Sequence, residues 1–286
     1  MIDRRLFVSG AAAAGLLPAS QAMAHDPVLS IRDLEKSAGV RLGVAMRDTG
    51  GGSRFDHRAN ELFPLASTFK LLAAAAVLAK VDSGDEALDR RVPVSASDLV
   101  AYSPTVEKRV GGDISIAELC EAAITLSDNA AGNLLLSRIG GPEGLTRYMR
   151  SIGDETTRLD RIEPGLNEAK PGDPRDTTSP AAMAADMAKL LVGEALKPSS
   201  REQLTKWLIA NKTGDRRIRA GAPKGWRVGD KTGTGERGTT NDVAILWPPG
   251  RKPILLAIYL TQSNRSMAER EEIIAEVTRN LTSHAH

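Results

Sequence analysis

Three short motifs carry reactive side chains in a fixed order along the chain, and a fold that uses them must bring distant segments together. The motifs are Ser67-Thr68-Phe69-Lys70, Ser127-Asp128-Asn129 and Lys231-Thr232-Gly233. Each motif alone is common by chance, but their ordered occurrence is specific. Together they supply a nucleophilic hydroxyl, a proton shuttle and a cationic anchor, which acyl transfer through a serine ester requires.

The first motif is predicted to lie in a buried helix that begins at Ser67. An apolar run of good helix formers follows at 71–79 and is too short to span a bilayer. Lys70 comes one helical turn after Ser67, so its amine reaches the serine oxygen. Desolvation and neighbouring cations would lower the pKa of Lys70, so that it accepts the serine proton at neutral pH. A surface lysine beside a serine N-cap is the alternative, but the apolar neighbours argue against it.

The second motif follows a predicted helix at 116–124 and lies near the start of a further helix. A polar triad at a helix end is often only a cap or a turn. Cleaving an amide, however, requires a proton for the leaving nitrogen, which Ser127 can deliver while Asn129 holds the substrate amide. We expect Asp128 to brace the turn.

The third motif lies in the first of three predicted strands that form an antiparallel meander, at 226–234, 243–247 and 254–260. Gly233 leaves room for a substrate along the strand. Lys231 and the hydroxyls of Thr232 and Thr234 suit a carboxylate. The backbone amides of Thr234 and Ser67 can face an oxyanion.

Residues 161–176, between the second and third motifs, are rich in Pro and Gly and predict a compact Ω-loop. Hydrolysis of an acyl ester needs a base on its far side, and Glu163 in this loop is the candidate. Without the other motifs, an ordinary acidic surface loop would be the better interpretation. The bond between Glu163 and Pro164 is a candidate for the cis form.

As a set, these residues resemble class A serine β-lactamases, and the resemblance covers the chain from Leu29 to about Thr282. It implies an α+β fold, the serine β-lactamase/DD-peptidase-like fold, in which an antiparallel β-sheet flanked by helices joins a second, all-helical lobe. It also implies that an ion pair between Arg161 and Asp176 closes the Ω-loop. The implied activity is hydrolysis of the β-lactam amide of penicillins and cephalosporins through a serine acyl-enzyme intermediate, which gives antibiotic resistance.

The resemblance implies five catalytic residues. Ser67 is the acylated nucleophile, Lys70 the acylation base or a relay, and Ser127 the proton donor to the β-lactam nitrogen. Glu163 activates the deacylating water, and Asn167 helps to position it. Whether Lys70 or Glu163 is the acylation base stays open.

Seven residues are expected to bind substrate: Asn129, Lys231, Thr232, Gly233, Thr234, Arg217 and Tyr102. In the family, an arginine beside the Lys-Thr-Gly strand grips the substrate carboxylate, and Arg217 has the spacing to Lys231 found in some members. We expect its neighbours Arg216 and Arg219 to be solvated. Tyr102 resembles the aromatic residue at the mouth of the family's pocket, and a surface tyrosine is the alternative.

Two other functions remain as alternatives, and the first shares the three motifs. A penicillin-binding DD-peptidase acylates in the same way but lacks a glutamate loop, so Glu163 and Asn167 argue against it. A β-lactam sensor domain would usually be tethered to membrane segments, and no stretch after the amino-terminal region is long and apolar enough to form one.

Cysteine and histidine usage argues against a disulfide or a metal. Cys120 is the single cysteine and is expected to be a buried, inert thiol. Some carbapenem-hydrolysing relatives carry a cystine where this chain has Ala66 and Gly235, which argues against carbapenem turnover without excluding it. The four histidines lack metal-ligand spacing, so we expect no metal and no other cofactor. With a net charge of +2 and no basic tract, we expect a small-molecule substrate, no nucleic-acid partner and a monomer.

Charged, apolar and small-residue zones follow one another at 1–24, which predicts an export signal, and the paired arginines suggest the twin-arginine route. Cleavage after Ala24 would leave a periplasmic or secreted catalytic domain at 25–286. Within it, we predict two lobes with the site between them: an α/β lobe at about 25–64 and 211–286, and a helical lobe at about 65–210. In the α/β lobe we expect a first helix, two strands that join the late strands, and a final helix on the sheet, at about 31–37, 40–47, 53–57 and 267–281.

Overall fold

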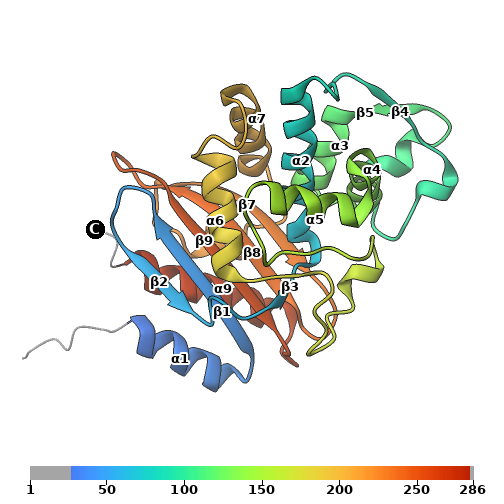
Figure 1. Ribbon diagram of the computed structural model, residues 1–286. Coiled ribbons are helices and arrows are strands. Elements are labelled where there is room, and N and C mark those ends of the chain that lie inside the picture. Colours follow the sequence, from blue (N-terminus) through green and yellow to red (C-terminus); the bar gives the residue numbers. More distant parts are fainter. Residues whose placement is uncertain (1–26, 284–286) are drawn as a thin grey trace, which may run out of the picture.

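The computed structural model describes residues 27–283, so the predicted export signal at 1–24 and its cleavage site lie outside the described residues. Figure 1 shows a sheet with helices on both of its faces, beside a group of helices drawn in cyan and green. None of the helices between residues 27 and 283 has the length and apolar character of a membrane span.

Five antiparallel strands form the main sheet in the order β2-β1-β9-β8-β7. Their bounds are β1 (Arg41–Asp48), β2 (Arg54–His57), β7 (Arg227–Thr234), β8 (Thr240–Trp247) and β9 (Ile254–Thr261). The early strands join the late ones as predicted, because β1 pairs with β9 over all 8 of its residues. At one edge, β7 pairs with β8 and carries Lys231 opposite Val243.

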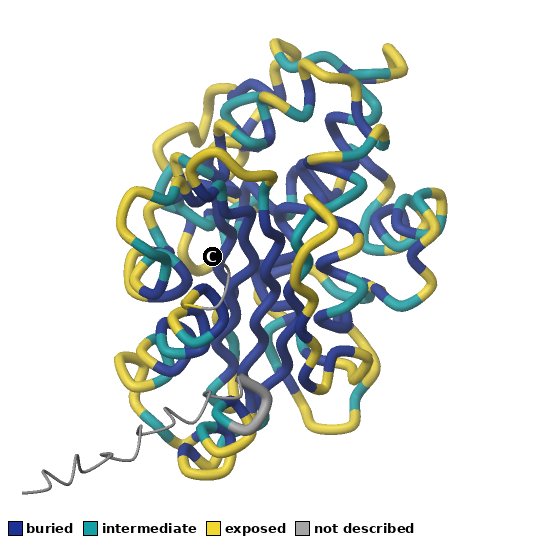
Figure 2. Tube along the Cα trace, turned by 90° about the vertical axis from the view of Figure 1, so that its left-hand side faces the viewer, coloured by how far each residue is buried: buried dark blue, intermediate teal, exposed yellow. Residues whose placement is uncertain are grey.

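Side chains alternate between the two faces of the sheet, and helices cover both faces. The covering helices are α1 (Pro27–Ala38), α6 (Pro180–Leu191) and α9 (Met267–Thr282). Leu256 and Ile258 of β9 pack beneath α1 and α9, whereas Leu255 and Tyr259 belong to a second cluster on the face that α6 covers. Figure 2 shows the central strands buried, with helices around them that expose their outer sides.

A group of helices packs beside the sheet around one central helix. The group comprises α2 (Phe69–Ser83), α3 (Ile116–Thr125), α4 (Asn129–Ile139), α5 (Gly141–Ser151) and α7 (Pro198–Ile209). Residues 69–78 of α2 are all buried, and the other four helices all contact α2. Sheet and helices together form the predicted α+β fold.

Short elements connect these layers. They are β3 (Phe63–Pro64), β4 (Arg91–Pro93), β5 (Asp113–Ser115), β6 (Thr177–Thr178), α8 (Ile218–Gly221) and the 3-10 turns η1 (Ala66–Thr68), η2 (Ala96–Asp98), η3 (Val106–Arg109) and η4 (Gly165–Asn167).

Ser67 lies just before the predicted helix and not at its first residue. It belongs to η1, and α2 begins only at Phe69. Ala66, the first residue of η1, has a left-handed φ of 42°, so the chain turns sharply just before the nucleophile. Because η1 contacts β7, this turn holds Ser67 at the junction between the sheet and the helical group.

Candidate active site

The hydroxyl of Ser67 lies between a lysine and a glutamate. Lys70 Nζ is 2.8 Å from Ser67 Oγ. Glu163 Oε1, in the Ω-loop, is 3.2 Å from the same serine oxygen. Lys70 and Glu163 also form an ion pair of 3.0 Å, and neither side chain is exposed. The Lys70 ammonium further donates to Asn129 Oδ1 at 2.6 Å and to the Ser127 carbonyl at 2.9 Å.

Burial is the main cause that lowers the pKa of Lys70. The carboxylates of Glu163 and Asp128 act in the opposite direction, but burial dominates. The predicted direction of the pKa shift is therefore confirmed. The pKa of Lys231 is held well below its usual value by burial first and by the neighbouring Lys70 second, and the repulsion between the two ammonium groups is mutual.

Ser127 and Asp128 occupy the turn between α3 and α4. Ser127 has a φ of 58°, and its Oγ lies 3.0 Å from Lys231 Nζ and 3.5 Å from Lys70 Nζ. Asp128 caps α4 by accepting from Ala131 N at 2.9 Å. Its other oxygen accepts from Thr105 N at 2.8 Å, so its bracing role is as predicted. The turn thus places the Ser127 hydroxyl between two lysines.

An ion pair closes the Ω-loop at its base, as predicted. Arg161 Nε lies 2.6 Å from Asp176 Oδ2, and Asp176 is 1% exposed. The second oxygen of Asp176 accepts from the backbone N–H groups of Asp160 and Arg161 at 2.8 and 2.9 Å. These contacts fix the two ends of the loop against one another.

Within the loop, Glu163 is held from both sides. Asn133 of α4 donates to the Glu163 carbonyl at 3.0 Å and accepts from its N–H at 2.9 Å. Asn167 Nδ2 donates to Glu163 Oε2 at 2.5 Å. The bond between Glu163 and Pro164 is cis, which confirms that prediction. The carboxylate is therefore fixed in orientation towards Ser67.

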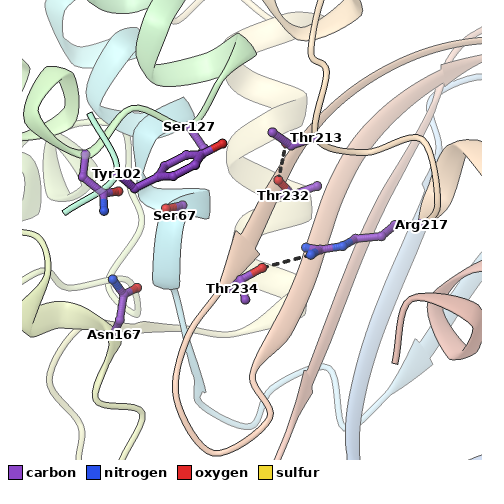
Figure 3. A pocket seen from close by; sticks show the side chains of 9 residues that line it. Ser67, Tyr102, Ser127, Asn167, Thr213, Arg217, Thr232 and Thr234 are labelled. Atoms are coloured by element: carbon purple, nitrogen blue, oxygen red, sulfur yellow. Dashed lines mark hydrogen bonds between the residues drawn. The ribbon is translucent and has the colours of Figure 1, made fainter. Parts of the chain in front are cut away.

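Residues of β7 and the segment before α8 form the sheet side of the pocket (Figure 3). Thr232 Oγ1 contacts Thr213 Oγ1 at 2.5 Å. Arg217 Nη2 donates to Thr234 Oγ1 at 2.9 Å. The Lys231 ammonium is fully buried and donates to the Thr232 carbonyl at 2.8 Å. Hydroxyls and the Arg217 guanidinium thus line this side, with the Lys231 ammonium buried behind them.

Of two neighbouring arginines, one behaves as the sequence predicted and the other does not. Arg216 is exposed, as expected. Arg219 was expected to be solvated, and that prediction is wrong, because it forms an ion pair of 2.5 Å with the fully buried Asp230. It also donates to the Leu208 and Ile209 carbonyls at 3.1 and 3.0 Å. Arg219 therefore ties α7 to β7 and stabilises the strand that carries Lys231.

Between these two sides lies a cavity of 320 Å³. Its lining residues are Ser67, Tyr102, Ser127, Asn129, Asn167, Thr213, Arg217, Thr232 and Thr234. Tyr102 stands at the mouth, 61% exposed, and its carbonyl accepts from Asn129 N at 3.0 Å. All predicted site residues thus line the cavity or contact a residue that does.

Known proteins place this geometry in one family. The sequence pattern of the β-lactamase enzyme family matches residues 28–285. The chain is 48% identical over 261 residues to β-lactamase Toho-1 of Escherichia coli, covering 91% of this chain and 90% of that one. It is 52% identical over 247 residues to β-lactamase AST-1 of Nocardia asteroides, covering 86% and 80%.

A solved structure agrees. The class A β-lactamase of the last common ancestor of Gram-negative bacteria matches with a TM-score of 0.90 and 60% identity, covering 91% of this chain and 99% of that one. The chain belongs to the class A β-lactamases. The predicted family, fold and serine β-lactamase activity are confirmed.

In this β-lactamase, Gly233 has a structural reason that differs from the predicted one. A Cβ on Gly233 would lie 3.0 Å from the Leu65 carbonyl and 3.1 Å from Thr68 Cγ2. These atoms belong to the chain around η1 and not to the open cavity. Gly233 therefore lets β7 approach the nucleophile turn closely.

Two residues of the β-lactamase site escaped the sequence analysis. Thr213 lines the cavity and contacts Thr232, but an isolated threonine between helices gives no signal. Asn133 holds the backbone of Glu163. Its spacing of four residues from Asn129 places both on one face of α4, which could have identified it.

Cys120 is buried in α3, and burial raises the pKa of its thiol, in line with the predicted buried thiol. Ala66 and Gly235, predicted to match a cystine of some relatives, are spatial neighbours: a Cβ on Gly235 would lie 3.7 Å from Ala66 Cβ. Among the described residues, no group of three histidine, cysteine or acidic side chains is placed to hold a metal ion.

Proposed function

We propose that this β-lactamase opens the ring of penicillins and cephalosporins by forming an ester on Ser67 and then hydrolysing that ester. One observation carries the proposal: Ser67 Oγ lies 2.8 Å from Lys70 Nζ and 3.2 Å from Glu163 Oε1. A serine between two proton acceptors can lose its proton during attack, and one acceptor remains available for a water molecule afterwards.

The carboxylate of the substrate binds on the sheet side of the cavity. Thr232 and Thr234 offer hydroxyl donors, and Arg217 offers its guanidinium through Nη2, which already lies 2.9 Å from Thr234 Oγ1. Lys231 adds positive charge behind them. This arrangement holds the β-lactam carbonyl against Ser67.

The other end of the substrate meets the helical side. Asn129 holds the side-chain amide of the substrate, and Tyr102 flanks the mouth of the cavity. The backbone amides of Ser67 and Thr234 form the oxyanion hole, in which developing negative charge is stabilised. Gly233, between them in the fold, lets strand and turn approach each other.

In acylation, Ser67 Oγ attacks the carbonyl carbon, a C–O bond forms and the C–N bond of the ring breaks. The Ser67 proton passes to Lys70 or to Glu163, which both lie within hydrogen-bond distance. Ser127 gives its proton to the leaving nitrogen and regains one from Lys70, 3.5 Å away. The lowered pKa of Lys70 supports its part in this relay.

In deacylation, Glu163 takes a proton from a water molecule, whose oxygen attacks the ester carbonyl. Asn167 fixes the carboxylate through its 2.5 Å contact. The C–O bond to Ser67 breaks, Ser67 regains its proton and the opened product leaves. A DD-peptidase has no such glutamate, so turnover and not trapping is expected.

The test is intact-mass spectrometry of residues 25–286 mixed with excess benzylpenicillin and sampled from seconds to hours while substrate loss is followed. Rapid loss with no lasting adduct is the expected result. A stable adduct of one penicillin mass with slow loss would overturn the proposal in favour of a penicillin-binding peptidase or sensor. If neither an adduct nor substrate loss were observed, acylation of Ser67 by this substrate would be excluded, and the proposal would be overturned.

We further propose that residues 1–24 direct export, with cleavage after Ala24, and that the catalytic domain at 25–286 works as a monomer in the periplasm or outside the cell. Its two lobes are the α/β lobe at about 25–64 and 211–286 and the helical lobe at about 65–210. The zoned composition of 1–24 supports the export step. Mass measurement of the exported protein would locate the cleavage site, and sedimentation would give its oligomeric state.

A further inference from the structure

A methionine contacts the arginine proposed to bind the substrate carboxylate. Met267 is the first residue of α9, and its Sδ lies 3.9 Å from Arg217 Nη2 and 3.8 Å from Arg270 Nη2. It is 39% exposed. The other described methionines are exposed by 4% or less: Met46, Met149, Met183 and Met187. Among the described residues, Met267 is thus the one methionine that solvent can reach.

The contacts of Arg217 explain why this sulfur matters. Arginine has five N–H donors. Nη1 donates to the Gly233 carbonyl at 3.0 Å and to the Asn241 carbonyl at 2.8 Å, and Nε faces Glu271 at 3.4 Å. The two hydrogens of Nη2 remain: one meets Thr234 Oγ1 and the other faces Met267. A thioether is a weak acceptor, so this last N–H is the most available donor for a substrate carboxylate.

We propose that Met267 is a reversible oxidation site whose sulfoxide weakens substrate binding by engaging Arg217. The inference rests on the proposed role of Arg217 in binding the carboxylate. The oxidant is a peroxide: the O–O bond breaks, one oxygen atom is transferred to the sulfur as an S–O bond forms, and the peroxide is reduced to water.

The sulfoxide oxygen is a strong, polar acceptor placed between two guanidinium groups. It accepts from Arg217 Nη2 and from Arg270 Nη2, the groups that already face the sulfur. Burial and the nearby Arg217 lower the pKa of Arg270, so an acceptor oxygen between the two cations is favoured. The substrate carboxylate then competes for a donor that is already occupied, and binding weakens.

The first experiment maps the oxidation. The folded enzyme is treated with increasing hydrogen peroxide, and its peptides are analysed by mass spectrometry. Met267 is expected to gain one oxygen before any of the four buried methionines. Oxidation of a buried methionine before Met267 would overturn the inference.

The second experiment measures KM and kcat for benzylpenicillin before and after complete oxidation of Met267. The KM of the wild type is expected to rise about five- to tenfold with kcat nearly unchanged, because one charge-assisted contact is lost in both ground and transition states. A methionine sulfoxide reductase should restore the original KM. An unchanged KM after complete oxidation would overturn the inference.

Two variants separate this effect from general damage. Met267→Leu lacks the sulfur, so peroxide should not change its KM, whatever its starting value. Met267→Gln carries an amide oxygen in place of the sulfur and should raise KM without peroxide. An equal peroxide effect on Met267→Leu would contradict the inference. If the untreated wild type failed to hydrolyse benzylpenicillin, the proposed function itself would fail, and the two failures are thus distinguishable.

Discussion

Two buried lysines face one another across the Ser127 hydroxyl, and their surroundings differ. Lys70, on the helical side, has a resident counter-ion, Glu163, at 3.0 Å. Lys231, on the sheet side, forms no ion pair with any carboxylate in the described part of the chain, and its ammonium meets the Ser127 hydroxyl at 3.0 Å instead. Burial lowers the pKa of both lysines. The paired carboxylate of Glu163 partly restores the proton affinity of Lys70, whereas Lys231 has no described carboxylate in direct contact.

This difference separates two tasks. A lysine paired with a carboxylate can pass a proton back and forth, because the charge of the pair changes little. A buried lysine without a counter-ion favours any ligand that brings a negative charge. Asp230 and Asp242, the acids close to Lys231, act to raise its pKa, but burial and the nearby cations outweigh them, and Asp230 is already paired with Arg219. The helical side is thus suited to proton transfer, and the sheet side to binding a carboxylate.

The largest effect is expected from removing the Ser67 hydroxyl, which depends on both proton transfer and substrate binding. Ser67→Ala should lower kcat/KM for benzylpenicillin by about 10⁵-fold or more and abolish the covalent adduct, because no other hydroxyl that lines the cavity lies between Lys70 and Glu163. Intact-mass spectrometry and steady-state kinetics would measure this. Thermal unfolding should change little. An adduct on the variant would show that another residue is acylated.

Glu163→Gln should make the surroundings of Lys70 resemble those of Lys231. Deacylation is expected to slow by about 10³-fold, because the general base is lost, so the acyl-enzyme accumulates. Stopped-flow and mass spectrometry would separate acylation from deacylation. Glu168→Gln, on the same loop but partly exposed, is the matched control and should turn over normally. Normal turnover by Glu163→Gln would assign the water-activating role to another group.

Arg217→Gln tests the sheet side. KM should rise about 10- to 100-fold, since charge-assisted hydrogen bonds to the carboxylate are lost. The melting temperature should also fall, because the Gly233 and Asn241 carbonyls lose a donor. The adjacent Arg216→Gln, at an exposed position, should leave both KM and melting temperature unchanged. Equal effects of the two substitutions would argue for long-range electrostatics instead of direct contact.

The missing counter-ion of Lys231 predicts a pH dependence. Because the pKa of Lys231 is lowered, raising the pH removes its proton and with it the attraction for a carboxylate. KM for benzylpenicillin should therefore rise roughly fivefold between neutral and alkaline pH. Lys231→Arg keeps its charge over this range and should show a flatter KM profile. The same slope in both proteins would exclude Lys231 as the titrating group.

A buried acid outside the site tests whether the argument about missing counter-ions is general. Burial and the carboxylate of Asp154 raise the pKa of Asp186 in α6 to about 9. The native state therefore holds a proton that the unfolded chain, with a pKa of about 4, releases. Stability should fall as pH rises between these values, and Asp186→Asn should be more stable than the wild type by about 1 kcal/mol at pH 8.

Chemical denaturation at pH 5 and pH 8 would measure this, and the gain should be smaller at pH 5. Asp154→Asn is the contrasting variant. Asp154 accepts from Thr156 N at 2.7 Å, and its pKa is lowered, so its loss should destabilise the protein. A gain in stability from both substitutions would contradict the assignment of the bound proton to Asp186.

Residues that act through local spacing were predictable from the sequence. Lys70 follows Ser67 by one turn, and Asp128 caps the helix that it precedes, so neighbours along the chain supplied the prediction. Arg219 was not predictable, because its partner Asp230 lies on a strand that only the fold brings to it.

The same limit applies to the site. Asn133 reaches the backbone of Glu163 across 30 residues of chain, and Arg217 meets Met267 across 50. Sequence motifs therefore identified the reactive groups, whereas the groups that orient them depend on tertiary packing. The burial of Asp230 was likewise invisible in a strand with ordinary alternation, and Asp242 lies outside the range predicted for its own strand.

Gly132 lies inside α4, where alanine would normally be the more stable residue by about 1 kcal/mol. A Cβ at this position would stand 2.9 Å from Lys70 Cε and 3.2 Å from Phe69 Cζ. The usual stabilising exchange of glycine for alanine should therefore fail here, since it would displace the side chain of Lys70, which we propose to relay protons. Directed evolution for heat resistance should accept glycine-to-alanine substitutions elsewhere on the helices and reject Gly132→Ala. Glycine at residue 132 thus makes α4 less stable but leaves room for the side chain of Lys70.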